Sequence, residues 1–277
     1  MRFVIIQIVV CLLLCLSTAV AAAVEVVDMS FLGYGEVRTA YISRGKVVDA
    51  APFSAQFVDG KLTIGDFGSI GASVWSASSF SGRGQSVSKR YAYNEADYNL
   101  HYCYDVKLAD DWMLSSRLAV QWVTFPGYRH PSLESRREWH VSQRLENPWL
   151  TPYYLFRRAY EPMQWCYWRV GLERRFAIAD RFAFIVDGFG EIGDERLSFC
   201  QYGAPVGRTA GNCHGGLNAL NVVFGVEYEL TEDIKLYGSI RQFGLISADA
   251  RRDVKASSSA QAKRDLTVAT IGVEVRF

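Results

Sequence analysis

The chain has 277 residues, of which 49% are hydrophobic, 14% aromatic and 21% charged. Its 30 Lys and Arg residues and 29 Asp and Glu residues leave a formal net charge of +1. Binding to nucleic acid needs a concentrated excess of Lys and Arg to neutralise phosphates, so this balance argues against nucleic acid as a partner.

The first 23 residues have the composition of a secretory signal peptide. Arg2 is followed by an apolar run from Phe3 to Leu16 and then by small residues up to Ala23. A retained membrane anchor is the weaker alternative, because the apolar run is shorter than the ~20 residues that a spanning helix needs. We predict cleavage after Ala23, which leaves residues 24–277 with 29 basic and 29 acidic side chains.

Beyond this leader, apolar and polar residues alternate in segments of about ten residues separated by turn signals. Between Tyr98 and Leu108 the even-numbered residues are apolar and the odd-numbered residues are polar or small. Similar alternation runs through residues 112–122 and 220–230. No stretch of eighteen apolar residues interrupts this pattern, so we expect strands rather than helices to cross a membrane.

The predicted connections alternate in length. Tight turns are expected at residues 109–111, 146–148, 179–180 and 231–233, and longer polar segments at residues 81–94, 126–136, 198–218 and 248–263. Short periplasmic turns and long outer loops are the plan of bacterial outer-membrane barrels. We predict one all-β, antiparallel transmembrane barrel over residues 24–277, with about twelve strands. Ten or fourteen are the possible counting errors, because connections such as residues 161–164 are ambiguous.

The last segment alternates as far as Phe277, with Ile271, Val273 and Val275 on the same apolar face. It resembles the C-terminal strand of outer-membrane proteins, which ends in Phe and which their barrel assembly machinery recognises. The resemblance implies that machinery as a partner and the outer membrane of a Gram-negative bacterium as the location. The alternative is an ordinary edge strand that ends on Phe.

Four cysteines remain after the leader. Cys200 and Cys213 flank a segment rich in Gly, Pro and Asn, so we predict that a disulfide closes this loop in an oxidising compartment. A zinc site with His214 is the rival, but the paired ligand spacings of such sites are missing. Parity turns Cys103 inward and Cys166 outward, and does not say whether they meet.

Parity also turns charges of both signs inward. The pore-lining candidates are Arg38, His101, Asp105, Arg117, Arg169, Glu173, Asp187, Glu227, Arg241 and Glu274. The same parity turns inward Glu36, Arg44, His140, Arg144, Glu191 and Arg276. These side chains could line a narrow aqueous pore, or they could pair with one another and plug the lumen.

His140 and Ser142 lie two residues apart and therefore on one face of a strand. The pair resembles the His-x-Ser pair of outer-membrane phospholipases and lipid A deacylases, in which His is the base for a Ser nucleophile. Parity turns His140 towards the lumen, whereas acyl substrates lie on the membrane side. We therefore expect no enzyme and no catalytic residue, and a lipid hydrolase that uses His140 and Ser142 is the weaker alternative. We also expect no cofactor and no metal.

A second resemblance covers about the first hundred residues. Tyr41, Arg44 and Gly45, then Gly71 and Trp75, then Glu95, Asp97 and Tyr98 are similar to the pattern of an uncharacterised bacterial outer-membrane family of the Gcw_chp type. The resemblance implies a barrel and no particular substrate.

The preferred function is passive passage of small polar solutes through a barrel in contact with outer-membrane lipid. The alternative is a closed barrel that has a structural or adhesive role through its outer loops. The sequence does not predict the solute or the oligomeric state.

Overall fold

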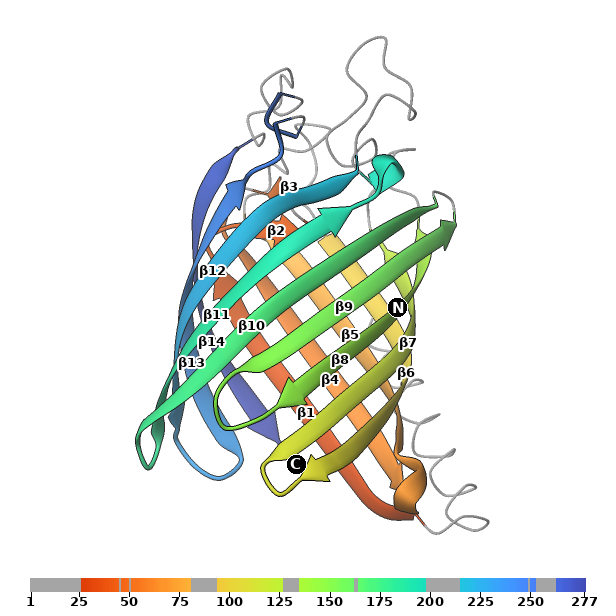
Figure 1. Ribbon diagram of the computed structural model, residues 1–277, viewed down its shortest axis with the longest axis vertical. Coiled ribbons are helices and arrows are strands. Elements are labelled where there is room, and N and C mark those ends of the chain that lie inside the picture. The colour runs from red at the N-terminus through yellow and green to blue at the C-terminus, as the bar shows by residue number, and fades with distance from the viewer. Residues whose placement is uncertain are drawn as a thin grey trace.

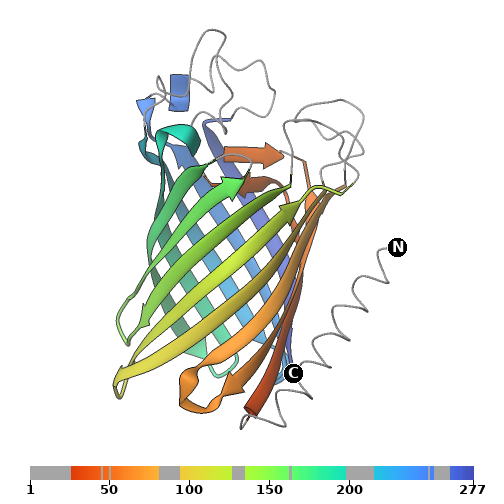
Figure 2. The ribbon, with the colours of Figure 1, turned by 90° about the vertical axis from the view of Figure 1, so that its right-hand side faces the viewer.

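Twelve strands close into one antiparallel barrel in the computed structural model (Figures 1 and 2). The structure describes residues 26–44, 46–49, 51–80, 94–126, 135–161, 164–197, 215–248, 250–252 and 263–277. The strands of the barrel wall are β1 (Val26–Arg38), β4 (Phe53–Ile64), β5 (Ser69–Ser79), β6 (Asn94–Ala109), β7 (Trp112–Thr124), β8 (Arg136–Glu146), β9 (Thr151–Glu161), β10 (Trp165–Ala179), β11 (Phe182–Gly193), β12 (Gly216–Glu229), β13 (Ile234–Leu245) and β14 (Asp265–Arg276). The predicted all-β barrel of about twelve strands is confirmed. The predicted leader lies outside the described residues.

The ring closes where β1 pairs with β14. Their register runs from Leu32 opposite Arg276 to Arg38 opposite Thr270. Every other wall strand pairs with the wall strands that precede and follow it in the chain. Closure leaves the sheet without an edge, so the backbone N–H and C=O groups of the wall find partners within it.

Side chains alternate between the interior and the outside of the wall. In β6 the odd-numbered Asp97, Asn99 and His101 are buried inside, whereas Leu100 is exposed on the outside. Large apolar side chains are exposed around the wall, among them Val58, Ile70, Leu118, Val170, Leu172, Leu220, Phe224, Ile240 and Ile271. The outer surface is therefore apolar and the inner surface is polar, as the alternation predicts. No helix in the described part of the chain is long and apolar enough to span a membrane.

Five short connections lie at one end of the barrel, which we call the turn rim; it is at the bottom of Figure 1. They comprise residues 65–68, which contain the short helix η1 (Gly65–Phe67), and residues 110–111, 147–150, 180–181 and 230–233. In one of them, Asn147 Oδ1 accepts the backbone N–H groups of Trp149 and Leu150, at 3.0 and 3.1 Å. Such an Asx turn lets the chain reverse within a few residues.

The opposite end, the loop rim, carries the remaining connections. Most of them are longer, but β9 and β10 are joined by residues 162–164 alone. Cys200, Cys213 and His214 lie outside the described residues, so the predicted disulfide stays a prediction. Cys103 and Cys166 are free thiols, and the register turns them to opposite faces of the wall.

Candidate functional site

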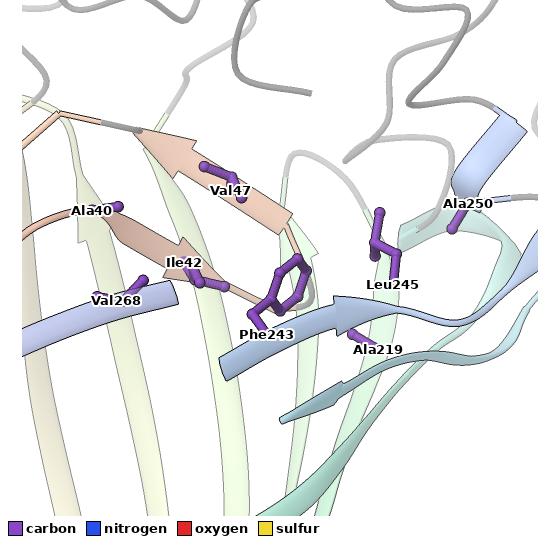
Figure 3. Close-up of a cluster of buried hydrophobic side chains, with 8 residues drawn as sticks. All are labelled: Ala40, Ile42, Val47, Ala219, Phe243, Leu245, Ala250 and Val268. Carbon is purple, nitrogen blue, oxygen red and sulfur yellow. The ribbon is translucent and has the colours of Figure 1, made fainter. Parts of the chain in front are cut away.

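A short hairpin, β2 (Tyr41–Ser43) and β3 (Lys46–Asp49), lies in the connection between β1 and β4 and does not join the wall. It crosses the barrel opening near the loop rim, as Figure 2 shows. Ile42 and Val47 of the hairpin pack in one cluster with Phe243 and Leu245 of β13, all of them at most 5% exposed (Figure 3). The hydrophobic effect therefore fixes this side of the hairpin to β13.

The hairpin also contacts strands β4, β5 and β6. The Tyr41 ring lies 5.1 Å from the Phe53 ring and 5.7 Å from the Trp75 ring, between centroids. Its hydroxyl donates to Glu95 Oε2 of β6 at 3.0 Å. Burial, together with the neighbouring Glu95 carboxylate, raises the pKa of the Tyr41 phenol well above its usual range. Tyr41 therefore acts as a neutral hydrogen-bond donor.

Arg44 connects the hairpin to the strands on the other side of the barrel opening. Its Nη2 donates to both carboxylate oxygens of Glu138 on β8, at 2.8 and 2.9 Å. Its guanidinium also lies over the Trp165 ring of β10, 4.9 Å from the centroid. Arg44 has φ of 52°, a left-handed conformation that costs energy for a residue other than Gly. The ion pair and the ring contact offset that cost.

Glu138 is the shared partner of three arginines. Besides Arg44, it accepts from Arg136 Nε at 2.5 Å and lies 3.8 Å from Arg157 Nη1. Its side chain is fully buried. A buried carboxylate is tolerated only where several donors compensate its lost hydration, so these four residues, the Glu138 cluster, depend on one another.

A second cluster, the Glu191 cluster, lies on β10 to β13. Glu191 Oε1 accepts from Tyr167 at 2.7 Å and from Arg169 at 3.2 Å. Glu191 Oε2 accepts from Asn221 at 3.0 Å and from Arg241 at 3.4 Å. These bonds tie four strands together across the inner surface.

Smaller groups of charged and polar side chains lie on the inner surface between these clusters and the turn rim. Arg117 Nη2 lies 3.1 Å from His101 Nδ1, and His101 Nε2 lies 3.4 Å from Asp59 Oδ1. Arg144 pairs with Glu173 at 2.5 Å. The interior therefore contains a sequence of ion pairs, and the Glu138 cluster with the hairpin forms its most enclosed part.

An open cavity of about 340 Å³ lies inside the turn rim. Its charged lining consists of Glu173, Arg175, Glu227, Glu229, Glu232, Asp233, Lys235, Glu274 and Arg276. Six of these side chains are acidic and three are basic, which leaves a formal excess of three negative charges. We call this cavity the vestibule.

The structure places all ten predicted pore-lining residues on the inner surface, but in separate groups. Arg169 and Arg241 meet at Glu191, and His101 meets Arg117. The remaining pairs are Arg38 with Glu36, Glu173 with Arg144, Asp187 with Tyr153, Glu227 with Lys235 and Glu274 with Lys235. Asp105 is exposed towards the turn rim. Whether these residues line a path for solutes stays a prediction.

Sequence reasoning missed Glu138, Asp59 and Arg157 and assigned Arg44 to an inward position by strand parity. Glu138 has the parity of His140, so the same two-residue period could have identified it. Arg44 reaches the interior from a hairpin that stands apart from the wall, which parity alone does not reveal.

His140 and Ser142 both face the interior. His140 Nε2 lies 3.4 Å from Asn99 Oδ1, and no hydrogen bond joins His140 to Ser142 within the described chain. On the neighbouring strand β7, His140 is paired in register with Ala119 and Ser142 with Arg117. The register therefore places neither His140 nor Ser142 on the outer, apolar face.

No protein-family model matches the chain, and no curated protein matches it in sequence. The resemblance to the Gcw_chp type therefore remains an expectation. Among solved structures, an outer-membrane channel from Pseudomonas putida F1 is similar with a TM-score of 0.52 and 7% identity, over 90% of this chain and 95% of that one.

Two further structures are similar at lower scores. The NanC porin has a TM-score of 0.48 and 13% identity, over 88% of this chain and 98% of that one. Outer membrane phospholipase A from Escherichia coli has a TM-score of 0.43 and 12% identity, over 90% of this chain and 93% of that one. At such identities the likeness to the Pseudomonas channel shows a shared barrel fold.

Proposed function

We propose that the protein is a porin-like barrel of the outer membrane that lets small polar solutes pass, with the β2–β3 hairpin at its narrowest section. The observation that carries this proposal is the division of the wall into two surfaces. Ion pairs follow the inner surface from Glu138 to the vestibule, while exposed apolar side chains cover the outside. A wall of this kind suits lipid on one side and water on the other.

The proposed orientation follows from the connections. Short turns mark the periplasmic side of bacterial barrels. The turn rim and its vestibule would therefore face the periplasm, and the hairpin would lie at the end that faces the outside of the cell. Export through a cleaved leader and recognition of the strand that ends in Phe277 belong to the same proposal. The name of the Pseudomonas protein, an outer-membrane channel, agrees with it.

The hairpin sets the limit on solute size in this proposal. It contacts β13 through Phe243 and β8 through Glu138, on nearly opposite sides of the ring of strands. The number of strands alone does not fix the radius of the open path through a barrel. The open cross-section therefore depends on how far the hairpin and the ion pairs fill the barrel opening at the loop rim.

Swelling of liposomes that contain the purified, folded protein tests the proposal. We expect swelling in small sugars and amino acids, and a rate that falls steeply as the solute grows. The folded state of the protein is checked by its heat-modifiable migration in electrophoresis. If liposomes with folded protein do not swell in any of these solutes, the result would instead support a closed barrel that acts through its outer loops.

A further inference from the structure

Arginines inside the barrel join carboxylates to aromatic rings. Four buried rings have a guanidinium group over them: Trp165 with Arg44, Phe189 with Arg169 and Arg241, Phe53 with Arg38, and Phe125 with Arg136. Each of these arginines also forms an ion pair with a glutamate of the inner surface. The ring and the carboxylate both attract the cation between them. The interior therefore repeats a unit of carboxylate, cation and ring.

One row of rings on the inner surface has no basic side chain over it. Tyr34 of β1, Phe57 of β4 and Trp75 of β5 are register partners on adjacent strands, and all three are half-buried. The Tyr34 and Phe57 rings stack, with 4.9 Å between centroids. In the part of the chain that the structure describes, no arginine or lysine lies over any of the three. We call these residues the ring row.

Asp97 of β6 is the register partner of Trp75 and lies at one end of the ring row. Its side chain is buried, and Gln121 donates to Oδ2, whereas Oδ1 has no hydrogen-bond partner among the described residues. Glu95, two residues away on the same face, pairs with Arg136 at 3.6 Å, but no described ion pair includes Asp97. A buried carboxylate is costly without a cation beside it. Asp97 and the ring row therefore supply the carboxylate and the ring of the repeated unit but no basic side chain.

The ring row extends from the vestibule to the hairpin. Glu274, which lines the vestibule, is the register partner of Tyr34 at the end of the row opposite to Asp97. At the other end, the Trp75 ring lies 5.7 Å from the Tyr41 ring of the hairpin, between centroids. A cation drawn into the vestibule by its acidic lining therefore meets a continuous series of rings that ends at Asp97.

We infer that Asp97 and the ring row bind the primary ammonium group of an organic solute. The N–H groups of an ammonium ion form charge-assisted hydrogen bonds with carboxylate oxygens, and aromatic faces attract its positive charge. The carbon chain of the solute would pack along the rings towards Tyr34. This inference names the class of solute for the proposed channel and therefore rests on the proposed function.

Ligand-observed NMR on the full chain in detergent micelles tests the inference with n-butylammonium and with n-butanol, a neutral molecule of nearly the same shape. We expect the protein to bind butylammonium more tightly. Asp97→Asn, which keeps the shape of the side chain and removes its charge, should lower that affinity about tenfold. Trp75→Leu should lower it about threefold, because it removes one ring. Asp105→Asn is the matched control, since Asp105 is exposed on the same face of β6 and should not contribute.

Three results would overturn the inference. Equal affinity for butylammonium and butanol would indicate that the Asp97 carboxyl carries a proton rather than a negative charge. The second is an unchanged affinity in Asp97→Asn, or an equal loss in Asp105→Asn. The third is displacement of butylammonium by an equal concentration of NaCl, which would indicate a site for inorganic cations.

Heat-modifiable migration of each variant in electrophoresis separates loss of the site from loss of the barrel. Binding is measured without passage, so liposome swelling on the same samples distinguishes the two proposals. Swelling without preferential binding of butylammonium contradicts this inference alone, and binding without swelling contradicts the channel alone.

Discussion

Arg44, which directly follows β2, and Glu138 on β8 are 94 residues apart in the chain, yet one guanidinium nitrogen of Arg44 bonds both carboxylate oxygens of Glu138. The contact holds a hairpin from the first loop-rim connection against the far side of the opening. It joins the hairpin to the single carboxylate of the Glu138 cluster, which is fully buried.

Glu138→Gln should destabilise the barrel strongly. The substitution removes the negative charge shared by Arg44, Arg136 and Arg157, and breaking a buried ion pair from one side costs about 3–5 kcal/mol. The measurement is the urea midpoint of unfolding, and heat-modifiable migration in electrophoresis reports the folded fraction at each urea concentration. Glu146→Gln is the control, because its ion pair with Arg144 is half-exposed and such pairs contribute about 0–1 kcal/mol. Equal midpoints for both variants would contradict the structural role of the Glu138 cluster.

Phe243→Ala should release the hairpin from the wall. Phe243 is fully buried against Ile42 and Val47, and loss of a buried Phe side chain costs about 3–5 kcal/mol. We expect trypsin to cleave after Lys46 in this variant while the wall stays protected. Ile240→Ala on the same strand removes an outward, exposed side chain and should leave cleavage as in the wild type. Protection of Lys46 in both variants would show that the cluster does not anchor the hairpin.

Gly171→Ala should be destabilising for a different reason. A Cβ at Gly171 would lie 2.4 Å from the Tyr153 ring, which covers the glycine from the neighbouring strand and donates to Asp187 at 2.8 Å. Displacing the ring should cost about 1–3 kcal/mol in unfolding free energy. A Cβ at Gly35 meets no atom within 4 Å, so Gly35→Ala is the matched control. A urea midpoint of Gly171→Ala equal to that of the control would exclude this packing role.

The vestibule should favour cations. Its six carboxylates and three basic groups leave a negative excess at the turn rim, which raises the local concentration of cations. The reversal potential in a KCl gradient should indicate a preference for K⁺, and Glu227→Gln/Glu229→Gln should reduce it. Salt near 1 M should also reduce it, because the screening length falls to about 3 Å. A preference for Cl⁻ in dilute salt would contradict the assignment.

The wall could be predicted from the sequence because each strand carries its own signal. The alternation from Tyr98 to Leu108 places every second side chain inside, and tight turns such as residues 179–180 fix the direction of the next strand. Both signals are local, so they need no knowledge of the partner strand. The closed ring follows, since each apolar face must meet lipid and each backbone edge must pair.

The hairpin could not be predicted in the same way. Its strands have three and four residues, and their position depends on Phe243 and Glu138, which are far away in the sequence. Parity assigned Arg44 to the interior as if it belonged to a wall strand. In the structure Arg44 belongs to the hairpin, which is not part of the wall, and it reaches the interior from there. The charged residues of the lumen were partly identified, but their partners depend on the three-dimensional register.

Single-channel current through the protein in a planar bilayer tests the central proposal most directly, with the wild type compared with Arg44→Ala and Arg44→Lys. We expect a small, steady conductance for the wild type. Arg44→Ala, which loses both the ion pair with Glu138 and the contact with Trp165, should conduct more, and Arg44→Lys, which keeps the charge, should lie between them. Equal conductance in all three, with folding intact, would show that the hairpin does not limit passage, and no conductance in any of them would contradict the channel itself.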